Sequence, residues 1–273
     1  MLLVDYHTHT NLSFDGDSDC STDALCASAI EKGITDLAIT DHYECNWQNV
    51  EEYKPFDTKK AYSEIMAAKE KYAGRLNLAY GIELGQISQV PQEAIKVLRD
   101  NKFDFVLCSA HNISNHLDFC YMDFNDPEIK FKIPYMFEKS IDELCKSLDI
   151  TDSIDSIAHL TYMQRYTALA NVNYDYTCHF DRIEMLFNKM ISKNVALEIN
   201  VSTLWKGLGF SMPDTSILKF YKECGGKLLT IGTDSHSTKN VGSGIKDGIA
   251  IIKSLGFDSI MTVKDGKKTL NKI

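Results

Sequence analysis

The stretch Leu2-Leu3-Val4-Asp5-Tyr6-His7-Thr8-His9 is a short apolar run that ends in two histidines. The run has the length of one β-strand, and its apolar residues do not alternate cleanly with polar ones. Both properties are typical of a strand that is covered on its two faces, as in a parallel sheet. Side chains two positions apart on an extended strand share a face, so we expect His7 and His9 to point to the same side.

The same kind of run recurs along the chain, with helical patterns between the runs. The further predicted strands are Asp36–Thr40, Leu76–Ile82, Phe103–Ser109, Ser153–Ala158, Val195–Ile199 and Lys227–Thr233. The predicted helices are Thr22–Lys32, Thr58–Tyr72, Gln92–Asn101, Pro134–Leu148, Asp181–Lys193, Asp214–Cys224 and Ile245–Leu255. Seven strands that alternate with helices predict βα units and a parallel α/β sheet. A last weak run, Ser259–Val263, is either a partial eighth strand or no strand.

Length and composition favour one domain. The 273 residues are 44% apolar and 25% charged, and an α/β barrel uses this length as a single unit. No Pro/Gly/Ser-rich linker interrupts the chain, so we predict one domain over residues 1–273. Two longer connections, Asn112–Ile133 and Thr161–Phe180, are rich in aromatic residues. They are either lids and binding loops or packed surface excursions.

Charge and hydropathy exclude several classes of protein. The net charge of −9 and the lack of a basic run disfavour a nucleic-acid or anionic-membrane binder. No apolar run reaches the roughly 18 residues of a membrane span, and no secretory signal is visible. The eight cysteines are scattered, without a C-x-x-C pair, as expected for reduced thiols. We therefore expect a cytoplasmic protein with no membrane or nucleic-acid partner.

The informative pattern is the position of the titratable residues. Six of the eight histidines follow predicted strands, together with several acids. The residues at or after strand ends are His7, His9, Asp41, His42, Glu83, His111, His159, Glu198, Asn200, Asp234 and His236. In a closed parallel barrel these ends converge on one face, and imidazole and carboxylate groups are good metal ligands. The sequence therefore predicts a multi-metal site, in which a carboxylate such as Glu83 or Asp234 bridges two cations.

Other binding and catalytic motifs lack residues that they require. Asp15-Gly16-Asp17-Ser18-Asp19 begins like a calcium-binding EF-hand loop, but Cys20 and Cys26 occupy the positions that need glycine and glutamate. The chain has no phosphate-binding P-loop, no convincing dinucleotide fingerprint and no nucleophile elbow. Nucleotide-cofactor and serine-hydrolase functions are therefore not supported.

The ordered motifs resemble a known family. They are His7-Thr8-His9, Ser13-Phe14-Asp15-Gly16, Thr40-Asp41-His42, Gly81-Ile82-Glu83, Ser109-Ala110-His111, Ala158-His159 and Gly232-Thr233-Asp234-Ser235-His236. This set, which spans almost the whole chain, is similar to the polymerase-and-histidinol-phosphatase (PHP) family, and most to its monofunctional histidinol-phosphate phosphatase branch. The resemblance implies a distorted, TIM-like (β/α)7 barrel with the metal site at the carboxyl-terminal rim of the strands.

The resemblance also implies three divalent metal ions, which are zinc, manganese or iron. The implied ligand sets are His7, His9, Glu83 and Asp234 for one ion, Glu83, His111 and His159 for the second, and Asp15, His42 and His236 for the third. Arg165 matches an arginine that grips the substrate phosphate in that branch, a task that suits a guanidinium. Where relatives tend to carry a further arginine, this chain has Trp205 and Lys206. Either Lys206 is a substitute phosphate ligand or the substrate preference has changed; Trp205 is an alternative contact that stacks on a flat substrate ring.

The implied activity is a cytoplasmic, metal-dependent phosphomonoesterase of histidine biosynthesis that converts L-histidinol phosphate, a small phosphorylated metabolite, to L-histidinol and phosphate. The expected mechanism is in-line attack by a metal-bridging hydroxide, with Glu83, Asp234 and His236 at the reacting centre. Three alternatives remain open: a PHP-type phosphoesterase with another phosphomonoester, nucleotide or phosphodiester substrate, a metal-dependent amidohydrolase, and a non-catalytic module that binds metal or a partner.

Overall fold

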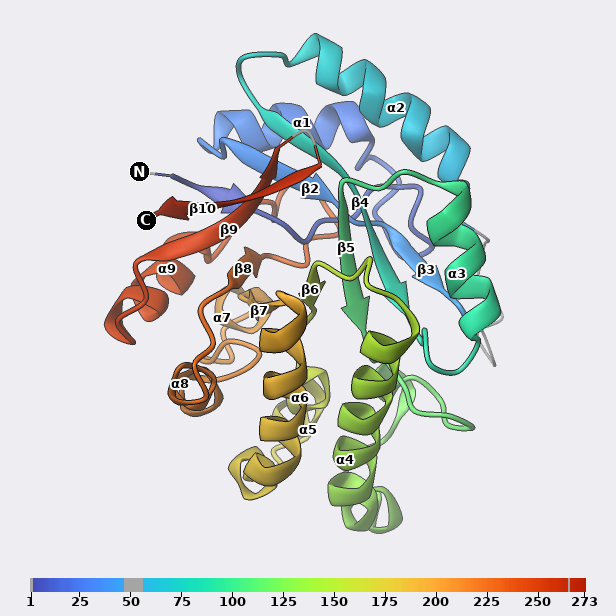
Figure 1. The fold of residues 1–273 in the computed structure, drawn as a ribbon, viewed down its shortest axis with the longest axis vertical. Helices are drawn as coiled ribbons and strands as arrows, with labels where there is room; N and C mark the ends of the chain where they lie inside the picture. Colours follow the sequence, from blue (N-terminus) through green and yellow to red (C-terminus); the bar gives the residue numbers. More distant parts are fainter. Residues whose placement is uncertain (1, 47–55, 265) are drawn as a thin grey trace.

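Seven parallel strands form a nearly closed barrel in this computed structural model, which describes residues 2–46, 56–264 and 266–273 (Figure 1). The strand order is β1-β2-β4-β5-β6-β7-β8. The barrel strands are β1 (Val4–Asp5), β2 (Asp36–Ile39), β4 (Asn77–Gly85), β5 (Phe105–Ser109), β6 (Ser156–Ile157), β7 (Ala196–Asn200) and β8 (Leu229–Gly232). The ring closes between its first and last members, because Tyr6 N donates to Ile231 O and Asp234 N donates to His7 O. The predicted (β/α)7 barrel is confirmed.

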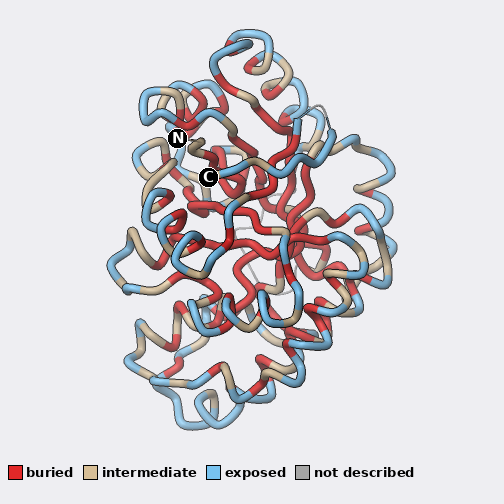
Figure 2. The backbone as a smooth tube through the Cα atoms, turned by 60° about the vertical axis from the view of Figure 1, so that its left-hand side comes forward, coloured by how far each residue is buried: buried red, intermediate tan, exposed pale blue. Residues whose placement is uncertain are grey.

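β4 is the strand that links the two halves of the barrel. Its first residues pair with β2, and its last residues pair with β5 on one edge and with the short strand β3 (His42–Glu44) on the other. β3 was not predicted, since it continues the β2 edge after a break at Thr40-Asp41. The strands are buried over nearly their whole length, as expected for a sheet covered on both faces (Figure 2).

The helices lie outside the strands. They are α1 (Thr22–Glu31), α2 (Thr58–Lys71), α3 (Pro91–Asp100), α4 (Pro127–Ile150), α5 (Tyr162–Leu169), α6 (Phe180–Lys193), α7 (Ser202–Trp205), α8 (Thr215–Glu223) and α9 (Ile245–Ser254). Polar caps fix several starts: Ser21 accepts from Ala24 N at α1, and Asp214 accepts from Ser216 N and Ile217 N at α8. All seven predicted helices are present.

Two predictions about the long connections were wrong in detail. α4 begins at Pro127, not at Pro134, because Asp126 caps it and its first turns carry exposed residues such as Phe131, which hide the apolar period. Residues 161–180 contain α5 and the 3-10 helix η2 (Tyr176–His179), so most of this connection is helical. A further 3-10 helix, η1 (Phe119–Tyr121), lies in the other connection.

The predicted run at Ser259 is a strand outside the barrel. β9 (Ser259–Lys264) pairs antiparallel with β10 (Lys267–Lys272). Asn77 Nδ2, at the start of β4, donates to Val263 O, and Lys268 lies 2.8 Å from Asp155, just before β6. The β9–β10 pair therefore covers the amino-terminal end of the barrel and leaves the carboxyl-terminal end free for the site.

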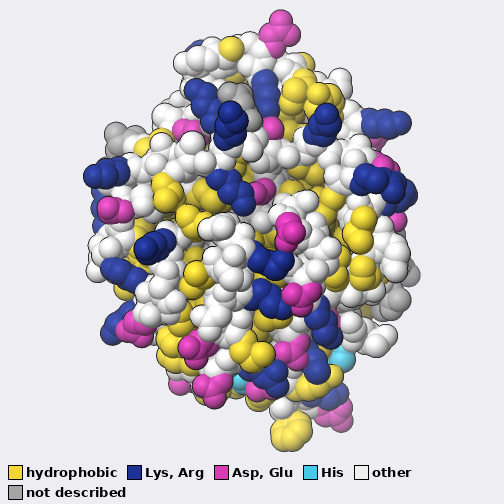
Figure 3. All heavy atoms as spheres, viewed as in Figure 1, with side chains coloured by type: hydrophobic (Ala, Val, Ile, Leu, Met, Phe, Trp, Pro, Cys, Tyr) yellow, Lys and Arg dark blue, Asp and Glu magenta, His cyan; other side chains and the backbone are white. Residues whose placement is uncertain are grey.

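The outer surface carries charges of both signs. On the face seen in Figure 3, basic and acidic side chains are interspersed. Within the described residues, no helix combines the length and the apolar character that a bilayer crossing requires.

Candidate metal centre

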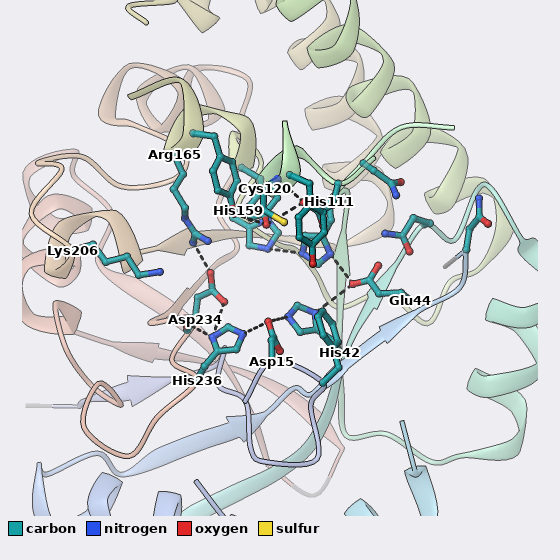
Figure 4. Close-up of a pocket in the computed structure, with 18 residues that line it drawn as sticks. Asp15, His42, Glu44, His111, Cys120, His159, Arg165, Lys206, Asp234 and His236 are labelled. Atoms are coloured by element: carbon teal, nitrogen blue, oxygen red, sulfur yellow. Dashed lines mark hydrogen bonds and ion pairs between the residues drawn. The ribbon is translucent and has the colours of Figure 1, made fainter. Parts of the chain in front are cut away.

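The carboxyl-terminal ends of the strands bring the predicted titratable side chains together. Figure 4 shows those that line the cavity above them, namely Asp15, His42, His111, His159, Asp234 and His236. His7 and His9 come from the segment after β1, Glu83 from β4, and His42 from the start of β3. The others follow β5, β6 and β8; they are His111, His159, Asp234 and His236. Asp15 approaches from the loop between β1 and α1. All nine predicted metal-ligating residues therefore meet at one rim.

Glu83 lies at the middle of the cluster and has no exposed surface. Its Oε1 lies 3.0 Å from His111 Nε2 and 2.9 Å from His159 Nε2. Its Oε2 lies 3.0 Å from His7 Nε2, 3.5 Å from His9 Nε2 and 3.0 Å from His42 Nδ1. The two oxygens of one carboxylate thus face two different groups of imidazoles.

Charge keeps this carboxyl group ionised. Burial alone would raise the pKa of Glu83, but the neighbouring His7, His42 and His111 outweigh burial and hold that pKa well below its usual value. An ionised carboxylate without solvent contact needs positive partners, and a divalent cation supplies them more strongly than an imidazole.

Asp234 joins the cluster to the arginine. Its Oδ1 lies 3.6 Å from His7 Nε2 and 3.4 Å from His9 Nε2, while its Oδ2 accepts from Arg165 Nη2 at 2.6 Å. Asp234 also has a φ of 53°, a left-handed backbone that is uncommon outside glycine. At the open side of the cluster, Asp15 Oδ2 lies 3.0 Å from His236 Nε2 and 3.5 Å from His42 Nε2.

The donor set fits divalent cations. Four overlapping groups have their ligand atoms within 4.8 Å of one another: His9/His42/His236, His7/Glu83/His159, His7/His9/Asp234 and His42/Glu83/His111. Nδ1 of His9 is buried without a hydrogen-bond partner among the described residues, and Nε2 of His9 and Nε2 of His236 face carboxylate oxygens at 3.0–3.5 Å without a well-directed hydrogen bond. Each such buried nitrogen costs about 1–3 kcal/mol unless a ligand uses its lone pair. Imidazole and carboxylate donors suit zinc, manganese and iron.

Two further carboxylates orient the imidazoles. Glu198 Oε1 lies 2.7 Å from His7 Nδ1, and its Oε2 accepts from the backbone N–H of His159 at 2.7 Å. Glu44 Oε1 lies 2.7 Å from His111 Nδ1. An acceptor at Nδ1 fixes the proton there and directs the Nε2 lone pair into the site. Glu198 was predicted on a strand without an assigned role, and Glu44 was not predicted, although its two-residue spacing from His42 indicates that both side chains share a face.

A cavity of about 310 Å³ opens over the cluster, a volume at the low end for small-molecule sites. Arg165 and Lys206 line one side of it. The guanidinium of Arg165 is held by Ser202 Oγ at 2.6 Å and by Asp234, and it lies 5.2 Å from the ring of Tyr162. Burial and the charge of Arg165 lower the pKa of Lys206.

Trp205 contacts the backbone just after β8 and the neighbouring Lys206. Its indole Nε1 donates to Thr233 O at 3.0 Å, and Lys206 Nζ lies 5.0 Å from its ring. Trp205 is not among the described residues that line the cavity. The two long connections, Asn112–Ile133 and Thr161–Phe180, both contribute to the cavity wall. Its lining includes Asn112, Asp118, Cys120 and Tyr121 from the first connection, and Tyr162, Arg165 and Tyr166 from the second.

Comparisons with known proteins give relatives of the same length. A family model described as PHP domain matches residues 5–202. A probable histidinol-phosphatase of Thermotoga maritima is 26% identical over 269 residues, which are 97% of each chain. The histidinol-phosphatase of Lactococcus lactis is 25% identical and is matched over 100% of this chain and 98% of its own.

Solved structures share the fold. The histidinol phosphate phosphatase of Lactococcus lactis, in complex with zinc, L-histidinol and phosphate, has a TM-score of 0.78 at 22% identity over 99% of both chains. A putative histidinol phosphatase of Listeria monocytogenes has a TM-score of 0.73 at 18% identity, over 89% of this chain and 99% of its own.

Proposed function

The chain belongs to the PHP domain family, and from this membership we propose that it is a metal-dependent phosphomonoesterase that hydrolyses L-histidinol phosphate to L-histidinol and phosphate. Curated histidinol-phosphatases match it over nearly the full length of both chains, which supports the substrate as well as the reaction class. The observation that carries the proposal is Glu83, whose carboxylate oxygens lie within 3.5 Å of nitrogens of five imidazoles.

Three divalent cations are the proposed cofactors. The proposed ligand sets are His7, His9, Glu83 and Asp234, then Glu83, His111 and His159, then Asp15, His42 and His236. Zinc, manganese and iron all suit these donors, and zinc accompanies the Lactococcus lactis enzyme. When bound, the cations would supply Lewis acidity towards phosphoryl oxygens and would lower the pKa of water.

Arg165 is the proposed ligand of the substrate phosphate. It lines the cavity, and its contacts with Ser202 and Asp234 hold the guanidinium in one orientation before substrate arrives. A preoriented guanidinium forms charge-assisted hydrogen bonds with phosphate oxygens at little entropic cost. Lys206 adds a second positive group on the same side of the cavity.

Asp234 couples the two functions of the site. One carboxylate oxygen faces His7 and His9, and the other accepts from Arg165. A change in cation binding therefore alters the electrostatic partner of the arginine, and substrate binding alters the partner of the carboxylate. With Glu83 and His236, Asp234 forms the proposed reacting centre.

We propose that residues 1–273 form a single catalytic domain. The proposed substrate makes a small phosphorylated metabolite its partner, and it places the protein in the cytoplasm, where amino-acid biosynthesis takes place.

A substrate panel tests the proposal. The purified chain, supplied with zinc, manganese or iron, is assayed for phosphate release from L-histidinol phosphate, mononucleotides, a phosphodiester and an amide. We expect histidinol phosphate to give the highest kcat/KM. Faster release from a nucleotide, or amide hydrolysis without phosphate release, would refute the proposed substrate or reaction.

A further inference from the structure

The side of the cavity opposite Arg165 and Lys206 is lined by carboxamides. Asn46, Gln86 and Asn112 follow the neighbouring strands β3, β4 and β5, and all three line the cavity. We call these three residues the amide wall. In Figure 4 the labelled Arg165 and Lys206 lie to the left of the imidazoles, and Glu44, which belongs to β3, lies to the right. The predicted metal ligands therefore separate a cationic side from an amide side.

Glu143 determines how these amides are oriented. Its Oε1 accepts from Ser114 N at 2.9 Å and from Ser114 Oγ at 2.8 Å, and its Oε2 lies 2.7 Å from Gln89 Nε2. A carboxylate only accepts hydrogen bonds, so Gln89 must turn its NH2 group towards Glu143. Gln89 Oε1 then accepts from Asn46 Nδ2 at 2.8 Å.

The same constraint fixes Asn112. The second N–H of Gln89 Nε2 points at Asn112 Oδ1, 3.0 Å away. Because Oδ1 is the acceptor of this bond, Asn112 Nδ2 is the atom left for another partner. Nδ2 makes no hydrogen bond with the described residues, whereas Oδ1 is taken by Gln89. Asn112 is 7% exposed and lines the cavity, so its two N–H groups are donors available to a ligand there.

Gln86 supplies the complementary acceptor. It is 5% exposed, and its Oε1 is buried without a donor among the described residues. No side-chain hydrogen bond to a described residue fixes its terminal amide, so a half-turn about the last torsion presents Oε1 to the cavity that Gln86 lines. Its φ of 52° is in the left-handed region, which costs roughly 1 kcal/mol for a residue with a side chain. Strain of this kind tends to persist where a side chain is held for function. Glu44 also lines the cavity, but His111 Nδ1 lies 2.7 Å from its Oε1, and its Oε2 is buried beside Gly85.

We infer that the amide wall binds the nitrogen-bearing part of the phosphoester, a neutral ring with one N–H donor and one lone-pair acceptor, such as imidazole. Asn112 Nδ2 donates to the ring's lone pair, and Gln86 Oε1 accepts from the ring's N–H. The phosphate then points to the cations and Arg165. This inference rests on the proposed function and deepens it, because it assigns residues that discriminate among phosphomonoesters.

Asn112→Asp tests the donor. The change replaces the Nδ2 group by oxygen and keeps the Oδ1 acceptor of Gln89, so the amide orientations stay set. Asn188→Asp, at an exposed position of α6, is the matched control. We measure kcat/KM for L-histidinol phosphate and for 2-aminoethyl phosphate, which lacks the ring, and the Kd of L-histidinol by calorimetry, with metal content determined for each protein.

We expect Asn112→Asp to lower the preference for histidinol phosphate over 2-aminoethyl phosphate about tenfold or more, and to weaken L-histidinol binding by a similar factor. Gln86→Met, which removes the acceptor without adding charge, is expected to act in the same direction. An unchanged preference in both variants, with wild type selective, would overturn the amide wall and leave the proposed function standing. A wild type without preference for histidinol phosphate would instead overturn the proposed function.

Discussion

Replacing Glu83 by glutamine removes one charge from the middle of the candidate metal centre and keeps the side-chain volume. The ligand atoms around it lie within 4.8 Å of one another, so a bound cation would be about 4 Å or less from the carboxylate. At that distance two unit charges interact by about 4 kcal/mol at an effective dielectric constant of about 20, and a divalent cation interacts more strongly. Since about 1.4 kcal/mol corresponds to a factor of ten, we expect cation affinity to fall at least about 10³-fold.

The assay compares metal content and turnover in the same preparation. Wild type and Glu83→Gln are dialysed against metal-free buffer, and bound zinc, manganese and iron are measured by mass spectrometry. Phosphate release from L-histidinol phosphate is then followed at saturating substrate. Glu184→Gln, an exposed position on α6, is the matched control and should behave as wild type.

Metal content and turnover should fall together in Glu83→Gln. Glu83 contacts both groups of imidazoles, so its loss weakens more than one cation position. A Glu83→Gln protein that folds normally, keeps its full metal content and turns over at the wild-type rate would show that this carboxylate bridges nothing.

Three further predictions follow from the site and the fold. Arg165→Ala should raise KM for histidinol phosphate about 10- to 100-fold with metal content retained, because charge-assisted hydrogen bonds contribute about 1.5–3 kcal/mol. A loss of bound metal with an unchanged KM would contradict the proposed phosphate role of Arg165. Dialysis against a chelator should lower Tm by about 10 °C, since saturating cation at 1,000 times its Kd adds about 4 kcal/mol; an identical calorimetric trace before and after would argue against a structural cation. Gly232→Ala should unfold the chain or empty the site, because a Cβ there would lie 2.3 Å from His7 Cβ and 2.7 Å from Glu198 Oε1. Gly74→Ala is the control: its Cβ meets no atom within 4 Å, and its φ of 75° costs about 1 kcal/mol of stability, but it should keep full metal content.

The strands could be predicted because each apolar run in the sequence contains more residues than the hydrogen-bonded strand that it forms. β1 and β6 have only two residues each, yet their runs are recognisable in the sequence. The start of α4 could not be found in this way, since Phe131 is 86% exposed and breaks the apolar period. The role of β9 depended on contacts with Tyr6 and Asn77, which are far from it in sequence.

The titratable side chains could be named from their position after strands, but the contacts between them could not. Glu198 looked like one acid on a buried strand, and its two hydrogen bonds, to His7 and to the backbone of His159, arise only when the barrel closes. The unused donor of Asn112 depends in turn on Glu143, from a helix that the sequence pattern delimited incorrectly. Hydrogen bonds that connect several residues far apart in sequence follow from the packing of the folded protein. The order of residue types along the sequence does not reveal them.

The contact between His7 and Glu198 spans 191 positions of the polypeptide, and β8 must still join β1 before Asp234 reaches the cluster. A growing chain on the ribosome therefore carries its first two histidines long before their partners exist. Closing so large a loop is entropically costly and late in folding. The complete rim, with Asp234 beside His7 and His9, therefore exists only after β8 has been made and has joined β1.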